Sequence, residues 1–284
     1  MKSVAVIGAT SQISKFILPR LAENGHRVLP IARSASTAHG FATYASTPGT
    51  DGRRLPPSPV DTLISTAPIT ITDDLCRLVD TLRPGHVIVV SSMSRISKEN
   101  APNAADRAFA AELARCEDIV QNKAAAAGAA WTILRPTMIY GAGQDRNVSF
   151  IADVIKRVGF FPIVAGAHGL RQPVHAEDLA AACVAAISQP GALNRAFEIG
   201  GGSVLTYAEF VRSIFHSLDR SPRLLPLPLG VFQAAVMLGR LVPSLAFVTP
   251  GMVARMSDDL IADNTDLGVI LEVHPRLFAP DGSN

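Results

Sequence analysis

The amino-terminal segment places the strongest constraint on the fold of this chain. Residues 4–7, Val-Ala-Val-Ile, form a short apolar run that stops at Gly8, and a helical pattern follows from about Ser11 to Asn24. A buried strand, a tight turn and a helix in this order direct backbone N–H groups and the positive end of the helix dipole towards one point. The segment therefore predicts the phosphate-binding end of a nucleotide-binding domain. The apolar run is also too short for a secretion signal.

Short apolar runs alternate with helical patterns through the first half of the chain. We expect strands at 3–7, 27–32, 61–66, 86–91 and 130–135, a weak one at about 41–45, and a long alanine-rich helix over about 103–127. This alternation predicts a parallel sheet with helices on both faces. The predicted fold class is α/β, a Rossmann-type doubly wound sheet.

The regular alternation ends after about residue 145. We expect helices near 147–158, 176–188, 206–217 and 229–241, with short strands near 161–164 and 196–199. This predicts a Rossmann domain over 1–145, with strand and helix contributions from about 165–200. A small, mostly helical substrate lobe with the C-terminal helices then covers 146–284. Prolines and glycines interrupt the apolar stretch 224–247, so no membrane span is expected.

Composition excludes several classes of protein. Hydrophobic residues make up 48% and charged residues 18% of the 284 positions, which indicates a globular chain rather than a disordered one. A net charge of +2, with dispersed basic residues, argues against a nucleic-acid partner. Cys76, Cys116 and Cys183 lack the spacing of a metal site or a redox motif, so we expect no metal and a reducing, cytoplasmic location.

Several segments resemble the extended or atypical branch of the short-chain dehydrogenase/reductase superfamily, which contains the NAD-dependent epimerases and dehydratases. Gly8-Ala9-Thr10 resembles the start of its fingerprint Gly-Ala-Thr-Gly-x-x-Gly, with Ser11 and Ser14 in place of the other two glycines. The segments 131–136, 139–141 and 172–179 are similar to later parts of the family pattern. The resemblance implies an NAD(P) site formed by Gly8, Thr10, Ser11, Gln12, Ile13, Thr66, Ala67, Pro68, Ser91, Arg135 and Pro136. A Rossmann-shaped domain with an empty site is the alternative.

The residues after the second strand bear on the choice of cofactor. An acid at this point would hydrogen-bond the ribose 2′-hydroxyl of NAD, whereas an arginine accommodates the 2′-phosphate of NADP. The chain has Arg33 followed by Ser34, and no acid. A guanidinium beside a hydroxyl suits a phosphate, so we favour NADP(H) over NAD(H). A solvated surface arginine is the alternative.

The resemblance also implies where catalysis would take place. Ser91 and Ser92 end the strand 86–91 and match the position of a substrate-contacting serine. In branches of the family with the pattern Tyr-x-x-x-Lys-x-x-x-Glu, Glu117 matches the acid, which leaves Phe109 and Leu113 where the catalytic tyrosine and lysine stand. Both proton-handling groups are thus missing. Tyr140 is a candidate for a replacement proton donor.

Three functional hypotheses follow. The first is an NAD(P)-dependent enzyme of the epimerase/dehydratase kind that acts by hydride transfer on a nucleotide sugar or similar carbonyl compound, with Arg171 near an anionic group. The second is a non-catalytic NADP(H)-binding regulatory or structural module, which the loss of the Tyr–Lys pair favours. The third is an enzyme with a relocated acid, Tyr140 or a serine-bound water. The chain is expected to be a monomer or a homodimer.

Overall fold

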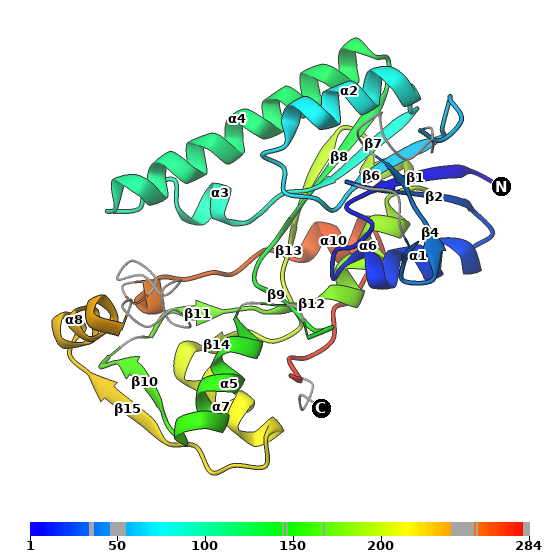
Figure 1. Cartoon of the computed structure of the whole chain (residues 1–284). Helices are drawn as coiled ribbons and strands as arrows, with labels where there is room; N and C mark the ends of the chain where they lie inside the picture. Colours follow the sequence, from blue (N-terminus) through cyan, green and yellow to red (C-terminus); the bar gives the residue numbers. More distant parts are fainter. Residues whose placement is uncertain are drawn as a thin grey trace.

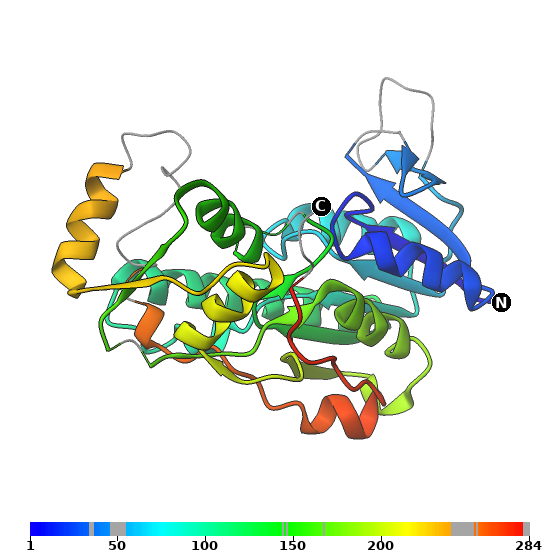
Figure 2. The same ribbon diagram turned by 90° about the horizontal axis from the view of Figure 1, so that it is seen from below.

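Figures 1 and 2 show the computed structural model of the chain, which describes residues 1–33, 37–45, 55–143, 145, 147–166, 168–239, 253 and 255–280. Ser34 of the expected cofactor site lies outside the described residues. In both views helix α8 and the strand pair β10–β15 lie at the end of the molecule away from α1 and the amino terminus.

The centre of the fold is a seven-stranded sheet in the order β13-β8-β7-β6-β1-β2-β5. Every pair in this sheet is parallel, as the sequence alternation predicts. The strand order runs in opposite directions from the β1–β6 junction, so the carboxyl ends of β1 and β6 flank the switch point where α/β sheets bind ligands. The strands are β1 (Ser3–Ile7), β2 (Arg27–Ala32), β5 (Tyr44–Ala45), β6 (Thr62–Ser65), β7 (His86–Val90), β8 (Ala130–Pro136) and β13 (Arg195–Ile199).

Helices cover both faces of this sheet (Figure 1). On one face α1 (Ser14–Glu23) packs against α6 (Ala176–Ala185), and on the other α2 (Thr72–Leu82) packs against α4 (Ala104–Ala126). Each face has its own hydrophobic core, because the central strands are buried on both sides. The remaining elements of this part are β3 (Thr37–Ala38), β4 (Phe41–Ala42), α3 (Ser94–Ser97), η1 (Pro190–Ala192) and α10 (Thr265–Ile270).

A second lobe follows the sheet and has a separate aromatic core that includes Phe161, Phe210 and Phe215. It contains the helices and strands α5 (Val148–Val158), β10 (Phe161–Val164), α7 (Tyr207–Ser217), β15 (Leu224–Leu227), α8 (Leu229–Gly239) and η3 (Arg255–Ser257). Two-residue strands β9 (Ile139–Tyr140), β11 (Leu170–Arg171), β12 (Val174–His175) and β14 (Leu205–Thr206) join it to the sheet. None of the described helices is long and apolar enough to cross a membrane.

Some boundaries differ from the expectation. Helix α1 begins at Ser14, three residues later than the pattern suggests, because residues 8–13 form the turn. The weak strand at 41–45 is two short strands on either side of Thr43: β4 pairs antiparallel with β3, whereas β5 joins the edge of the main sheet. Strand β15, which pairs in parallel with β10, is absent from the sequence prediction.

Candidate cofactor site and substrate cavity

Gly8 occupies the tightest point of the turn between β1 and α1. Its φ of +77° lies in the left-handed region that favours glycine. A Cβ atom at this position would lie 2.8 Å from both the amide nitrogen of Ala67 and the hydroxyl oxygen of Thr66. The carboxyl ends of β1 and β6 therefore touch through a residue without a side chain. This is the close approach of backbones that a phosphate-binding turn requires.

Three hydroxyl groups fill the space beneath this turn. The Ser14 hydroxyl donates to the carbonyl oxygen of Gly8 at 3.0 Å, and its oxygen lies 3.0 Å from Thr66 Oγ1. Ser11 Oγ lies 2.9 Å from Thr66 Oγ1 and accepts a hydrogen bond from the amide of Ser14 at 3.1 Å. Thr66 in turn can donate to the carbonyl oxygen of Ile7 or Gly8, at 3.1 and 3.0 Å. The two serines that replace glycines thus point inward and tie α1 to β6.

The turn leaves donors available at the amino end of α1. The amides of Gln12 and Ile13 donate to no other described residue, and the first turn of α1 contains no acidic residue. The buried Oε1 atom of Gln12 has no hydrogen-bond partner among the described residues. Free amides at a helix amino terminus are a ready site for a phosphate. The donor set and the Gly8 contact therefore fit a dinucleotide.

The other expected cofactor residues lie along the same edge of the sheet. Thr10 is exposed in the turn, and Ala67 and Pro68 come one residue after the end of β6, behind Thr66. Arg33 is exposed just beyond the carboxyl end of β2, which pairs in parallel with β1 through Ile7 and Ile31. An exposed guanidinium one strand away from the phosphate turn is where a ribose 2′-phosphate is bound in such sheets.

The serine and arginine of the expected catalytic edge are engaged with one buried carboxylate. Ser91 donates to Glu117 Oε1 at 2.6 Å, and Arg135 donates to Oε1 through Nε at 3.1 Å and to Oε2 through a terminal nitrogen at 2.6 Å. Arg95 Nε lies 3.1 Å from Glu117 Oε2, an ion contact without hydrogen-bond geometry. The Glu117 side chain is 1% exposed. Ser92 Oγ instead accepts from the amide of Ser94 at 3.1 Å, so it shapes the loop into α3.

The two positions that match the catalytic tyrosine and lysine carry no proton-handling group. Leu113 is buried in the core beneath the sheet, whereas the Phe109 ring is 39% exposed. The ammonium group of Lys98 lies 5.0 Å from the centroid of that ring and 3.0 Å from Asp106 Oδ1. The ammonium group of Lys98 therefore lies beside Phe109, the residue at the position of the family's catalytic tyrosine. Lys98 was not among the residues predicted from the sequence. Its position between the strand 86–91 and the helix 103–127 was the sequence feature that could have indicated it.

Tyr140 lies in an aromatic cluster beneath the carboxyl-terminal segment. Its side chain is 1% exposed, and its ring makes edge contacts with His175 and Phe278 at centroid distances of 5.1 and 4.9 Å. Its hydroxyl accepts from the amide of Ala279 at 3.4 Å. His175 is also the N-cap of α6, where its Nδ1 accepts from the amide of Glu177 at 3.2 Å. These are the surroundings of packing residues, and a catalytic role for Tyr140 stays a prediction.

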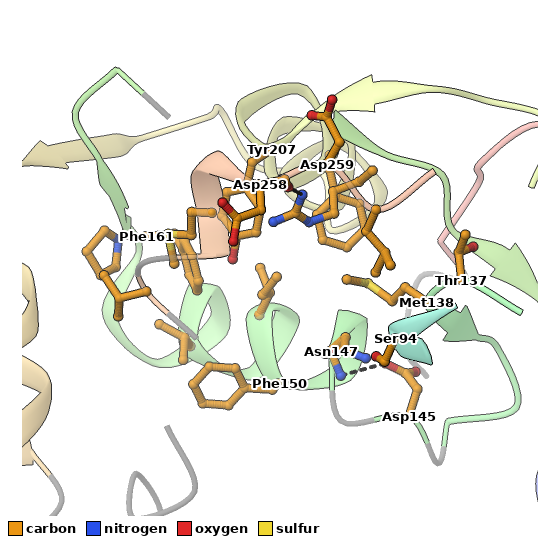
Figure 3. A pocket seen from close by; sticks show the side chains of 18 of the residues that line it. Ser94, Thr137, Met138, Asp145, Asn147, Phe150, Phe161, Tyr207, Asp258 and Asp259 are labelled. Atoms are coloured by element: carbon orange, nitrogen blue, oxygen red, sulfur yellow. Dashed lines mark hydrogen bonds between the residues drawn. The ribbon is translucent and has the colours of Figure 1, made fainter. Parts of the chain in front are cut away.

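A cavity of about 790 Å³ lies between α3, α5, α7, β10 and α8. Gln12 of the phosphate turn is among its lining residues, so the cavity extends to the edge of the cofactor site. Figure 3 shows Ser94 and Thr137 towards one end, Phe161 at the other and Phe150 between them. Arg171, also in the wall, is 5% exposed, and one of its terminal nitrogens donates to the carbonyl oxygens of Leu170 at 2.8 Å and Asp258 at 2.6 Å.

Comparison with known proteins agrees with this geometry. The sequence profile of the NAD dependent epimerase/dehydratase family matches residues 4–200, which is more than half of the chain. The chain belongs to this family. The family binds NAD(P), and the resemblance seen in the Gly8 turn is thereby confirmed. Among the described residues no group of side chains could hold a metal ion.

Curated relatives have different activities. The chain is 30% identical over 143 residues to subunit 9 of the mitochondrial NADH dehydrogenase [ubiquinone] 1 alpha subcomplex of Arabidopsis thaliana, a match that covers 47% of this chain and 35% of that protein. It is 26% identical to the chloroplastic divinyl chlorophyllide a 8-vinyl-reductase of Zea mays, over 88% of this chain and 67% of the relative. The first of these alignments, like those to several other relatives, spans about a third of the relative's length.

Solved structures confirm the fold. The UDP-glucose 4-epimerase of Thermotoga maritima, with UDP-glucose, superposes with a TM-score of 0.65 at 16% identity, covering 96% of this chain and 93% of that one. An NADPH-dependent quinone oxidoreductase of Escherichia coli superposes with a TM-score of 0.69 at 18% identity, covering 97% and 96%. At these identities the likeness shows the fold alone.

Proposed function

We propose that this protein binds NADP(H), in preference to NAD(H), at the Gly8 turn. The single observation that supports the proposal is the contact of Gly8 with Thr66 and Ala67 just after β6, which leaves no room for a Cβ in the turn before α1. The amides of Gln12 and Ile13 would hold the pyrophosphate, and Arg33, with Ser34 outside the described residues, would hold the 2′-phosphate. Ser91, Arg135 and Pro136 mark the nicotinamide end.

We further propose that the protein is an oxidoreductase that acts on a carbonyl compound in the adjoining cavity. Bound NADPH would supply a hydride to the carbonyl carbon, while the carbonyl oxygen takes up a proton from water. Relatives and structural neighbours include a UDP-glucose 4-epimerase, a vinyl reductase and a quinone oxidoreductase, so nucleotide sugars and apolar carbonyl compounds are both candidate substrates.

In place of the missing Tyr–Lys pair, Lys98 would stabilise the substrate oxygen during hydride transfer. Lys98 is a lining residue of the cavity, and its ammonium group contacts Asp106 and the Phe109 ring. A fixed cation beside the substrate oxygen stabilises the negative charge that develops there as the hydride arrives. The Ser91 hydroxyl is less suited to this task, because its proton is already donated to Glu117.

A second candidate function is a non-catalytic module that uses the bound dinucleotide as a structural or redox-sensing element. The observation that favours it is the Glu117 cluster, in which Ser91 and Arg135 stabilise the protein itself. Steady turnover of NADPH with a carbonyl substrate would exclude this function. Tight NADPH binding without turnover of any carbonyl compound or nucleotide sugar would support it.

The test of the cofactor proposal is titration of the purified protein with NADPH and with NADH by calorimetry. We expect NADPH to bind more tightly, and Arg33→Ala to weaken NADPH binding about tenfold or more, because a hydrogen bond to a charged group is worth about 1.5–3 kcal/mol. Binding of NADH should not change. Arg27→Ala is the matched control, since Arg27 is exposed at the opposite end of β2. Absence of binding of either nucleotide below millimolar concentration would refute the proposal.

We also propose a cytoplasmic location. The three cysteines are free thiols, two of them buried, which suits the reducing cytoplasm expected from the sequence. We also propose a monomer or homodimer, with a small-molecule substrate and no nucleic-acid partner. Light scattering on the purified protein measures the oligomeric state directly.

A further inference from the structure

The body of the 790 Å³ cavity is apolar. Phe150, Val154 and Val158 of α5 form one wall, Phe161 of β10 and Phe232 of α8 form another, and Val253 completes the lining there. Phe150 and Val154 are partly exposed and Val158 is 54% exposed, although large apolar side chains gain free energy from burial. An apolar occupant of drug-like size would cover them, since ligand pockets commonly enclose about 300–1,000 Å³.

The charges around the cavity disfavour a diphosphate. Among the described lining residues the cations are Lys98 and Arg171, and the carboxylates are Asp145, Asp258 and Asp259. Lys98 lies at the end that meets the cofactor site, and Arg171 is buried with its guanidinium on backbone carbonyls and 5.1 Å from the centroid of the Tyr207 ring. A nucleoside diphosphate needs cations or free amides for its phosphates. Among the described lining residues it would instead meet more carboxylates than cations.

Hydroxyl, amide and ammonium groups gather at one end of the cavity. Ser94 and Ser97 of α3, Lys98 and Thr137 lie on the side of the Rossmann sheet, and Gln12 joins them from the phosphate turn. Figure 3 shows Ser94 and Thr137 apart from Phe161 at the other end. The end that meets the cofactor site therefore offers hydrogen-bonding groups, whereas the side formed by α5, β10 and α8 is apolar, and Asp258 and Asp259 line the wall near Tyr207. A carbonyl group at the polar end, attached to an apolar body, matches this distribution.

We infer that the cavity binds an uncharged carbonyl compound with an apolar ring or chain, rather than a nucleotide sugar. The carbonyl end lies beside Lys98, and the apolar body extends between α5 and β10. The carbonyl identity rests on the proposed function, whereas the apolar character rests on the cavity alone. Burial raises the pKa of Tyr207 to about 12, so its phenol adds no negative charge to the wall at neutral pH.

The test is equilibrium binding of a benzoquinone with a decyl tail to the NADP⁺-saturated full chain. We expect saturable micromolar binding that millimolar UDP-glucose does not displace. Val154→Asp places a charge in the apolar wall and should weaken quinone binding at least tenfold. Val269→Asp is the matched control, because Val269 is 74% exposed on α10, and it should leave binding unchanged. Val154→Trp reduces the cavity volume without adding charge, and it should weaken quinone binding by a similar factor. A loss of binding in both Val154 variants, when both are folded, is then due to the cavity itself.

The outcomes distinguish this inference from the proposed function. Displacement of the quinone by UDP-glucose, equal effects of the two aspartate variants, or no saturable binding would overturn the apolar assignment even if NADPH binds normally. Quinone binding without any NADPH or NADH binding would leave the cavity assignment intact and refute the proposed function. Circular dichroism melts of the three variants verify that each is folded before binding is compared.

Discussion

Removal of the Thr66 hydroxyl tests whether the serine-containing turn is a tied structure. Thr66 Oγ1 lies within hydrogen-bond distance of two carbonyl oxygens and two serine hydroxyls, at 2.9–3.1 Å, and the residue is 8% exposed. Thr66→Val keeps nearly the same shape and removes the group at which all four contacts meet. The change therefore isolates the hydrogen-bonding contribution from packing.

The expected loss of stability is about 2 kcal/mol. A net hydrogen bond contributes about 1 kcal/mol, and a buried polar group left without a partner costs about 1–3 kcal/mol. After the change Ser14 still donates to Gly8, and Ser11 can still donate to Ser14 at 3.1 Å. The carbonyl of Ile7 loses its side-chain donor, so the cost lies in the lower part of the combined range. NADPH binding should weaken as well, because the free amides of the turn lose their support.

Urea unfolding followed by circular dichroism, together with NADPH titration, measures both effects. Thr81→Val is the matched control: the Thr81 hydroxyl donates to the carbonyl of Arg77 at 2.8 Å on the exposed side of α2. It should cost less than about 0.5 kcal/mol, as surface changes do. A Thr66→Val variant within 0.5 kcal/mol of the parent, with unchanged NADPH affinity, would refute the tied-turn interpretation.

Three other variants test the rest of the account. Glu117→Gln leaves two arginines near a neutral group and should lower the free energy of unfolding by about 3–5 kcal/mol. The control is Glu112→Gln, an exposed position on the same helix, which should change that free energy by less than about 0.5 kcal/mol. Equal urea midpoints of the two variants would contradict the assignment of Glu117 to a buried ion cluster. Tyr140→Phe should keep carbonyl turnover within about twofold, and its abolition in a folded variant would restore Tyr140 as the acid. Burial lowers the pKa of His86 to about 4. Because the unfolded chain binds the proton first, stability should fall as pH drops from 6.5 to 4, by up to about 3 kcal/mol. A His86→Asn variant with the same pH slope would exclude this residue as the cause.

Much of the sheet was predictable, because central parallel strands are continuous apolar runs. The runs before Gly8 and before Ser91 end where β1 and β7 end, to within one residue. Periodicity could not reveal the two-residue strands or β15, which contains Pro226 and pairs with a strand more than 60 residues away. Short pairings of this kind are decided by tertiary contacts and leave no period in the sequence.

The cofactor turn was predictable for the same local reason, since a strand, a glycine and a helix follow one another directly. The inward direction of Ser11 and Ser14 was not, because it depends on Thr66 from another strand. The contact of Arg171 with Asp258 was also not predictable, because the two residues are far apart in the chain. The same holds for Lys98 beside Phe109, because Lys98 lies in a segment without a motif. Sequence spacing identified which groups were lost from the catalytic helix; only the fold shows what stands beside them.

A crystal structure of the complex with NADPH tests the central claim most directly. We expect the pyrophosphate oxygens within 3.2 Å of the amide nitrogens of Gln12 and Ile13, a usual N–H···O distance, the 2′-phosphate beside Arg33, and the nicotinamide facing the cavity near Lys98. A dinucleotide bound elsewhere, or a turn that stays empty at saturating NADPH, would contradict the account.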